Sequence, residues 1–289
     1  MGRSNNLIII KKKEKKKEKK KEMKELIRDY QMLEEIYLGA FDDLYLAEKN
    51  GIKYVLKVYK DPTGHSSDFD AFVKNQEMML PMLQSLGDMA ENIVEQFVHE
   101  GRFYQVKDYI EGQNLRDWMD ANDDYDKRLD IAIQLCECMK AVHSVGIVRQ
   151  EIKPEDVMVV KNLSRKSGVR LVLIDFDWAV PNGKIVRRVG TPGYSNVDSD
   201  LTYKSDIFSL GIVLCELLTG CNPYAYDDSR VYDVLEWQTW VKEKDYTAPI
   251  NINDELPSEI NDIIEQCLDP GPDKRPTTDE ILAVLKKNE

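Results

Sequence analysis

Two carboxylates and a lysine lie close together in the stretch 148–160, which reads VRQEIKPEDVMVV. Glu151 and Asp156 are five residues apart, and Lys153 lies between them. The apolar, β-branched run 157–160 follows at once and predicts a buried strand. A carboxylate, an ammonium group and a second carboxylate on one short loop form an arrangement that suits the handling of a metal-bound phosphate.

Two further charged residues accompany strand-like runs. Lys57 lies inside the run KYVLKVY at 53–59, and Asp175 follows the apolar run 171–174. A charge in the middle of a strand must have a partner or a ligand, because an unpaired charge is costly to bury. Lys57 is therefore a candidate for an ion pair or for contact with a ligand.

The elements that must position these residues follow from periodicity. A strand-rich first part and a mostly helical second part, joined near 108–112, predict a two-lobed α+β chain with its ligand site in the cleft between the lobes. An amphipathic segment at 26–36 leads into the strands, the turn at 49–51 predicts a hairpin, and Pro81 predicts a helix kink. Strands are predicted at 37–47, 53–59, 92–100, 103–110, 157–160 and 170–174, and helices at 68–86, 115–120, 125–145, 205–218, 231–241, 258–267 and 278–287.

Charge is divided unevenly along the 289 residues. Residues 1–25 carry 11 Lys and Arg against 4 Glu, and the remainder carries 29 against 48 acidic residues, so an acidic body follows a basic arm. By bulk charge the body is a poor nucleic-acid binder. The low-complexity arm predicts a solvated helix, and the alternatives are a localisation signal, a contact with an anionic surface, or a clasp on the acidic body.

The remaining bulk features point to a soluble intracellular protein. The five cysteines are odd in number and have no metal-like spacing, which predicts free thiols in a reducing compartment. Cys136, Cys215 and Cys267 are expected to be small core residues on helices. No apolar run approaches the length of a transmembrane segment. We expect a cytoplasmic protein, or a nuclear one if the arm is a localisation signal.

Several ordered motifs resemble one known family. They are VLKVY around Lys57, RQEIKPED, LIDFD around Asp175, GTPGY at 190–194, SDIFSLG at 205–211 and DKRPT at 273–277. From about residue 30 to 286 the chain resembles a eukaryotic-type Ser/Thr protein kinase domain with degenerate motifs. The resemblance implies a kinase-like domain at 26–289, with an N-lobe at about 26–108, a hinge at about 108–112 and a C-lobe at about 113–289.

The resemblance also implies roles for the charged residues. Lys57 would hold the ATP phosphates, and Asp156 and Asp175 would hold Mg²⁺. Glu151 stands in place of the catalytic aspartate, and Lys153 would neutralise the transferred phosphoryl group. Four further residues would contact the nucleotide, namely Gly39, Asp108, Ile110 and Met158.

Three structural roles follow from the same resemblance. The helix acid that pairs with Lys57 would be Glu77, with Asn75 or Gln76 as alternatives at that site. Asp206 resembles a buried aspartate that anchors the catalytic loop. Asp198 replaces a glutamate that pairs with Arg275, so that ion pair is expected to be strained or bridged by water.

The catalytic loop departs from the family pattern. Glu151 is one methylene longer than aspartate, which predicts slow transfer, because a displacement of about 1 Å costs on the order of 10²-fold in rate. Arg149 and Gln150 replace the usual His-Arg pair, and no Ser, Thr or Tyr lies between Trp178 and Gly190. We therefore predict no control by phosphorylation in that segment.

The nucleotide-binding side departs further. Tyr37 and Asp42 replace the outer glycines of the glycine-rich loop, and Asp42 would repel phosphates. Asp177 replaces a glycine after Phe176, which should stiffen that turn and add charge near the metal. Lys107 places an ammonium group at the back of the pocket, where it would pair with an acid such as Glu77 or Asp175 or reach a ligand phosphate.

Two hypotheses follow. The chain is either a weak or specialised Ser/Thr protein kinase that uses ATP and Mg²⁺ on a protein hydroxyl, or a pseudokinase that acts as an interaction scaffold with or without nucleotide. Thr191 implies the Ser/Thr acceptor class. A third hypothesis, a small-molecule kinase on the same fold, fits GTPGY and the helical second part less well.

Overall fold

The computed structural model describes residues 26–39, 41–60, 66–183, 190–198, 200–225 and 233–289. The chain divides into two compact units, Met1–Gln113 and Asn114–Glu289. The expectations for the basic arm at 1–25 fall outside the described residues.

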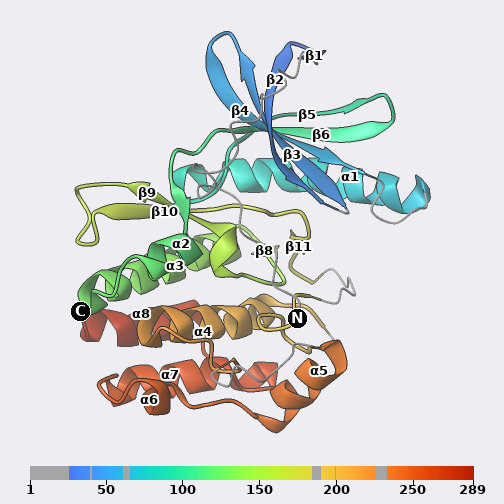
Figure 1. The fold of residues 1–289 in the computed structure, drawn as a ribbon. Coiled ribbons are helices and arrows are strands. Elements are labelled where there is room, and N and C mark those ends of the chain that lie inside the picture. The colour runs from blue at the N-terminus through green and yellow to red at the C-terminus, as the bar shows by residue number, and fades with distance from the viewer. Residues whose placement is uncertain (1–25, 40, 61–65, 184–189, 199, 226–232) are drawn as a thin grey trace. The chain divides into compact units, whose positions relative to one another are not determined.

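The first unit contains a six-stranded antiparallel sheet in the order β1-β2-β3-β4-β6-β5 (Figure 1). The segment 26–36, expected as an amphipathic lead-in, is itself strand, because Ile27, Tyr30 and Met32 are buried in the sheet core. The strands are β1 (Leu26–Ile27), β2 (Tyr30–Leu38), β3 (Asp42–Lys49), β4 (Ile52–Tyr59), β5 (Ile93–His99) and β6 (Arg102–Asp108).

Local sequence explains two features of this unit. The β3–β4 hairpin turns at Asn50 and Gly51, whose φ angles of 54° and 78° are those of a two-residue turn with left-handed backbone. Helix α1 (Ser66–Gln84) runs along one side of the sheet in Figure 1 and contains Pro81. The short 3₁₀ helix η1 (Gly87–Met89) follows it.

The second unit is mainly helical. Its helices are α2 (Leu115–Asp120), α3 (Tyr125–Ser144), α4 (Tyr203–Thr219), α5 (Val234–Glu243), α6 (Pro249–Ile252), α7 (Ser258–Cys267) and α8 (Thr278–Lys287). The strands β7 (Gln113–Asn114), β9 (Val157–Lys161) and β10 (Val169–Leu173) form one sheet, and β8 (Ile147–Val148) pairs with β11 (Val180–Pro181). The 3₁₀ helices are η2 (Pro154–Asp156) and η3 (Pro272–Lys274).

The core of the second unit forms around α4, which packs against α3 and α7, while α3 also packs against α8. Residues 205–218 of α4 are all buried. Gly211 is required by close packing, because a Cβ atom there would lie 2.4 Å from Cβ of Cys267. Cys136, Cys215 and Cys267 are free, buried thiols on helices, as predicted.

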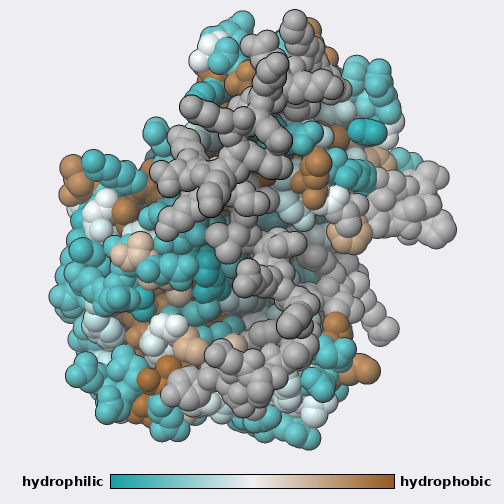
Figure 2. All heavy atoms as spheres, viewed as in Figure 1, coloured by the Kyte–Doolittle hydropathy of each residue, from teal (hydrophilic) through white to brown (hydrophobic). Residues whose placement is uncertain are grey.

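The surface seen in Figure 2 is mostly hydrophilic over the described residues, with apolar side chains in small groups. Most charged side chains of both units lie at the surface, as is usual for a chain with this many acidic residues. None of the helices in the described part of the chain combines the length and the apolar character that crossing a membrane requires.

Candidate active site

The loop that carries Glu151, Lys153 and Asp156 is fixed by its backbone. Asp206, fully buried on α4, accepts hydrogen bonds from the backbone N–H of Arg149 at 3.0 Å and from that of Gln150 at 2.8 Å. Gln150 itself adopts a left-handed φ of 76°. The expected anchoring role of Asp206 is confirmed, because its carboxylate satisfies two consecutive backbone donors where the chain leaves β8.

Sheet pairing explains how Asp156 and Asp175 come to lie near each other. Strands β9 and β10 pair antiparallel, with Leu173 opposite Val157, and the N–H of Ile174 donates to the carbonyl of Asp156 at 2.9 Å. The two aspartates therefore lie at the same end of this two-strand ladder. Asp156 is buried, whereas Asp175 is exposed.

The turn after β10 has left-handed backbone at Asp175, the residue predicted to bind the metal. Its φ angle is 62°, whereas Asp177 has no positive φ. The loss of a glycine at Asp177 therefore does not demand a strained backbone at that position. Asp177 is instead a buried side chain.

The charged groups around Asp156 have opposite effects on its pKa. Burial raises the pKa of Asp156 to about 8, and the charges of Asp175 and Glu151 add to this, while Lys153 and Arg149 act to lower it. Lys153 lies 3.8 Å from Asp156, Nζ to Oδ1, and its own pKa is raised mainly by the charge of Asp156. These four groups therefore share one electrostatic environment with Asp156.

Glu151 is held against the segment that contains GTPGY. Its Oε2 accepts a hydrogen bond from the N–H of Thr191 at 2.5 Å. A Cβ atom at residue 190 would lie 2.5 Å from the same oxygen, so the glycine there permits the longer acidic side chain to reach the backbone. One oxygen of Glu151 is thus used in holding this segment.

Arg149 occupies the interior of the second unit and is 4% exposed. Its Nη2 donates to the carbonyl of Ile174 at 2.9 Å and to that of Asp175 at 3.4 Å. Its guanidinium carbon lies 4.2 Å from the ring centroid of Phe176, a cation–π contact. Arg149 therefore holds the backbone of the turn that presents Asp175.

In the first unit, Lys57 is an ion-pair partner of Asp42. The distance from Nζ to Oδ2 is 3.0 Å, and the two side chains are 5% and 20% exposed. The pairing follows from register, because Leu44 lies opposite Lys57 on β4 and Asp42 lies two residues away on the same strand, β3. The acid expected to repel phosphates instead neutralises the lysine expected to bind them.

The loop between β2 and β3 is held by a contact within it and by Lys60, which follows β4. The N–H of Gly39 donates to the carbonyl of Asp42 at 2.8 Å, and Lys60 Nζ donates to the carbonyl of Gly39 at 2.8 Å. A Cβ atom at Gly39 would lie 2.5 Å from the Tyr37 ring, so that ring packs directly on the glycine. The space that a glycine leaves for a ligand is here filled by Tyr37.

Gln76 is a buried polar residue of α1 and is 2% exposed, whereas the neighbouring Glu77 is exposed. Gln105 on β6 donates to Gln76 at 3.0 Å and accepts a hydrogen bond from the Tyr59 hydroxyl at 2.8 Å. The structure thus places an amide, not a carboxylate, on the buried side of α1. The expectation for Glu77 rested on charge type, which did not reveal which face of the helix it occupies.

Lys107 pairs with Glu91, at 2.9 Å between Nζ and Oε1, and both side chains are buried. The expectation that Lys107 pairs with an acid is confirmed, but the partner is neither of the two acids named as examples, Glu77 and Asp175. Glu91 lies just before β5, whose Ile93 is opposite Lys107 in the ladder, so the sheet register selects this partner. A buried ammonium group is thereby neutralised within its own unit.

The other predicted nucleotide contacts are divided between the two units. Asp108 ends β6, is exposed, and accepts a hydrogen bond from the Asn92 side chain at 2.8 Å. Ile110 is half-buried after that strand. Met158 is buried on β9 of the second unit.

Residues 30–285 match a family model described as a protein kinase domain. The chain belongs to the protein kinase family. Its two-lobed α+β fold, with a small β-rich lobe and a larger helical lobe, is the one that the motifs predicted.

Relatives of this kinase domain come from distant organisms. Serine/threonine-protein kinase max-2 of Caenorhabditis elegans is 30% identical over 273 residues, which cover 89% of this chain and 39% of that protein. Probable serine/threonine-protein kinase CPE1738 of Clostridium perfringens is 23% identical over 270 residues, 89% of this chain and 38% of its own length. Serine/threonine-protein kinase D of Synechocystis is 25% identical over 250 residues, which cover 79% of this chain and 48% of that protein. The chain thus spans less than half the length of these relatives.

The ion pair between Asp198 and Arg275 also differs from expectation. Arg275 donates from Nη1 and Nη2 to the two oxygens of Asp198, each at 2.7 Å, and both side chains are fully or almost fully buried. The prediction of a strained or water-bridged pair was wrong. The shorter acid suffices because Asn196 accepts from the N–H of Asp198, and Ser205 Oγ donates to the same carboxylate, which holds it in place.

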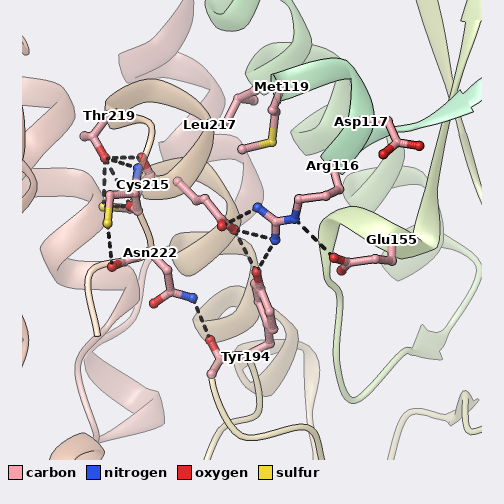
Figure 3. A network of polar contacts seen from close by, with 12 residues as sticks. Arg116, Asp117, Met119, Glu155, Tyr194, Cys215, Leu217, Thr219 and Asn222 are labelled. Carbon is pink, nitrogen blue, oxygen red and sulfur yellow. Dashed lines mark hydrogen bonds and ion pairs between the residues drawn. The ribbon is translucent and has the colours of Figure 1, made fainter. Parts of the chain in front are cut away.

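A polar network around Arg116 was not predicted. Figure 3 shows the Arg116 guanidinium between Glu155 and the hydroxyl of Tyr194. It also forms a two-nitrogen contact with Glu216 of α4. No local motif marks this residue, because its partners lie 39, 78 and 100 positions away along the chain.

Asp156 and Asp175 are the two carboxylates that were predicted to hold Mg²⁺. Among the described residues no group of three or more His, Cys, Asp or Glu side chains could hold a metal ion. Mg²⁺ normally takes one or two carboxylates together with substrate phosphates and water. Asp156 and Asp175, at one end of a shared ladder, fit that requirement.

Proposed function

We propose that this kinase domain is a slow, ATP- and Mg²⁺-dependent phosphotransferase that acts on Ser or Thr hydroxyls of proteins. The observation that carries the proposal is that four charged residues share one electrostatic environment. Glu151, Lys153 and Asp156 lie on one loop, whose backbone Asp206 anchors. Asp175 lies at the end of the β9–β10 ladder next to Asp156. The metal, acceptor and phosphoryl roles of the family each retain a group of the right charge here, whereas the buried polar residue on α1 is the amide of Gln76.

The residues would divide the chemistry as follows. Bound MgATP supplies the transferred γ-phosphoryl group and neutralises part of its charge. Asp156 and Asp175 would hold Mg²⁺, and Lys57 would bind phosphate oxygens once Asp42 has released it. The acceptor oxygen forms a bond to the γ-phosphorus as the bond to the leaving ADP oxygen breaks. Glu151 would orient that acceptor and take its proton, and Lys153 would stabilise the transferred charge.

A second candidate is a pseudokinase that binds partners without transferring phosphate. It is favoured by the closed state of the β2–β3 loop. There Asp42 pairs with Lys57, Lys60 caps the carbonyl of Gly39, and Tyr37 packs on that glycine. All three contacts must loosen before phosphates can approach the loop backbone.

A labelled-phosphate transfer assay separates the two candidates. Wild type is compared with Glu151→Ala and Asp175→Ala on a generic Ser/Thr protein substrate, next to thermal-shift titrations with ATP in the presence and absence of Mg²⁺. We expect weak transfer by wild type, at least tenfold less by either variant, and an ATP shift that requires Mg²⁺. Equal label from all three proteins would reject the transferase. An absent ATP shift would leave only a nucleotide-free scaffold.

We further propose that the basic arm at 1–25 contacts an anionic surface inside the cell. Its net charge of +7, from 11 basic and 4 acidic residues, supports this role. A chain that lacks residues 1–25 should bind anionic vesicles more weakly at low salt. Unchanged vesicle binding and unchanged cellular location would contradict this role and support a solvated segment that does not bind.

A further inference from the structure

The loop that joins β9 to β10, residues 162–168, carries an apolar side chain in an exposed position. Leu163 is 80% exposed, the highest fraction of any large apolar side chain in the part of the chain that the structure describes. In Figure 1 this loop lies at the left edge of the second unit. Single exposed apolar residues are common on protein surfaces, so the surroundings of Leu163 decide whether its exposure has a meaning.

Those surroundings are basic on a domain that is acidic. Residues 157–174 contain four Lys and Arg and no Asp or Glu, whereas residues 26–289 as a whole carry 29 basic against 48 acidic residues. Lys161, Arg165 and Lys166, which lie within three residues of Leu163 along the chain, are all exposed. A local excess of positive charge, opposite to the charge of the domain, indicates an anionic partner at this loop.

The backbone of the loop is paired within itself. The N–H of Asn162 donates to the carbonyl of Gly168 at 2.8 Å, and the N–H of Arg165 donates to the carbonyl of Asn162 at 3.2 Å. The side-chain oxygen of Asn162 also accepts from the N–H of Ser164 at 3.1 Å. Leu163 is therefore presented by a formed loop.

Helix α3 fixes the base of this loop. The N–H of Ser167 donates to Asp130 at 2.9 Å, and the side chain of Gln134 donates to the carbonyl of Val169 at 3.2 Å. Asp130 and Gln134 are both buried, so these contacts belong to the core of the second unit. A surface that is already ordered pays little conformational entropy when it binds a partner.

The positive charge continues onto the end of α8. Glu137 on α3 receives Lys286 of α8 at 2.8 Å and lies 3.8 Å from Arg165. The hydrogen bond to Glu137 raises the pKa of Lys286, and the charge of Arg165 opposes this shift, so the two cations lie near each other. One carboxylate is thus shared by two cations, and a net positive charge remains beside the loop.

We propose that the β9–β10 loop is an interaction surface for anionic phospholipid bilayers. Leu163 enters the boundary between headgroups and acyl chains, while Lys161, Arg165 and Lys166 contact the lipid phosphates. The basic side chains alone would suit any polyanion, but an exposed aliphatic side chain at the tip of a loop suits a fluid apolar layer. This surface requires neither the proposed transferase function nor the basic arm.

The first experiment measures co-sedimentation of the full chain with vesicles of phosphatidylserine and phosphatidylcholine, against vesicles of phosphatidylcholine alone. The variants are Leu163→Ala, the double variant Arg165→Gln with Lys166→Gln, and the control Leu235→Ala. Leu235 is 74% exposed on α5 and has the acid Glu236 next to it, so it matches Leu163 in exposure but not in charge. Unfolding midpoints close to that of wild type check that each variant is folded.

We expect wild type to bind the anionic vesicles only. Leu163→Ala should bind them at least about fivefold more weakly, because part of the apolar contact is lost. The double variant should bind about tenfold more weakly, because two phosphate contacts are lost. Leu235→Ala should bind like wild type. The basic arm acts through charge, so binding by the arm alone would leave Leu163→Ala equal to wild type, and that result would overturn the proposal.

The second experiment detects insertion directly. Leu163→Trp and Leu235→Trp each add one indole, whose emission is taken as the difference from wild type. Anionic vesicles should shift the added emission of Leu163→Trp to the blue, and lipids with brominated acyl chains should quench it, while Leu235→Trp should show neither effect. No shift for Leu163→Trp would overturn the proposal. Binding of a DNA duplex that is weakened in the double variant but unchanged in Leu163→Ala, without vesicle binding, would assign the surface to nucleic acid instead.

Discussion

The substitution Asp42→Asn should increase the affinity for MgATP. In the present structure Asp42 lies 3.0 Å from Lys57, and phosphates compete with it for the same ammonium group. The bare attraction at that distance is about 5 kcal/mol at an effective dielectric constant of 20, but desolvation cancels much of it. Because Asp42 is 20% exposed, the net cost of releasing Lys57 lies between about 1 and 3 kcal/mol. Removing it should strengthen ATP binding roughly fivefold to hundredfold.

Isothermal titration with ATP and Mg²⁺ measures this gain directly, and a thermal-shift titration shows its other consequence. Without nucleotide, Asp42→Asn should unfold at a lower temperature, because Lys57 is left buried and without that carboxylate; with ATP, its midpoint should rise more than that of wild type. The matched control is Asp43→Asn, the next residue on β3, whose carboxylate lies 2.8 Å from Lys60. It should lose stability without gaining ATP affinity. Equal ATP affinity for Asp42→Asn and wild type, or an equal gain in the control, would refute the reasoning.

Three further variants test the second unit. Asp198→Asn leaves Arg275 buried without its carboxylate partner, so urea unfolding should show a loss of about 3–5 kcal/mol in the free energy of unfolding. A loss below about 1 kcal/mol would contradict the direct ion pair. The folded-state pKa of Asp156 is raised to about 8, so between pH 4 and 8 the folded state keeps a proton that the unfolded state releases. The wild-type free energy of unfolding should therefore fall as the pH rises through this range, by up to about 1.4 kcal/mol per pH unit. Asp156→Asn should flatten this slope in unfolding curves measured without Mg²⁺, and an unchanged slope would show that other groups produce it. Gly190→Ala places a Cβ atom 2.5 Å from Glu151, so it should lower both the unfolding midpoint and phosphate transfer, and a wild-type midpoint would contradict this packing.

Elements with local signals were predictable from the sequence. The helices at Leu115–Asp120, Ser258–Cys267 and Thr278–Lys287 begin and end where the periodicity placed them. The β3–β4 turn followed from Asn50 and Gly51, which tolerate positive φ. The two-residue strands β8 and β11 were missed, because pairs this short have no periodicity of their own.

The partners of buried charges were much less predictable. Sequence motifs identified Asp206 as the anchor of the catalytic loop, which its hydrogen bonds to Arg149 and Gln150 confirm. The motifs did not reveal which acid would pair with a given lysine. Lys107 pairs with Glu91 through sheet register. Partners of this kind depend on which face of an element a residue occupies, and an error of one residue moves a side chain to the opposite face.

The contact between Asp42 and Lys57 suggests what limits the rate of the proposed reaction. Asp42 lies 3.0 Å from Lys57 in the first unit, so phosphates must displace this carboxylate before they reach the ammonium group. Releasing Lys57 should therefore act on nucleotide binding alone. Asp42→Asn should lower the KM for ATP and leave the KM for an acceptor peptide unchanged. A domain whose transfer residues were themselves defective would show no gain in transfer, because improved binding of ATP cannot restore a misplaced Glu151.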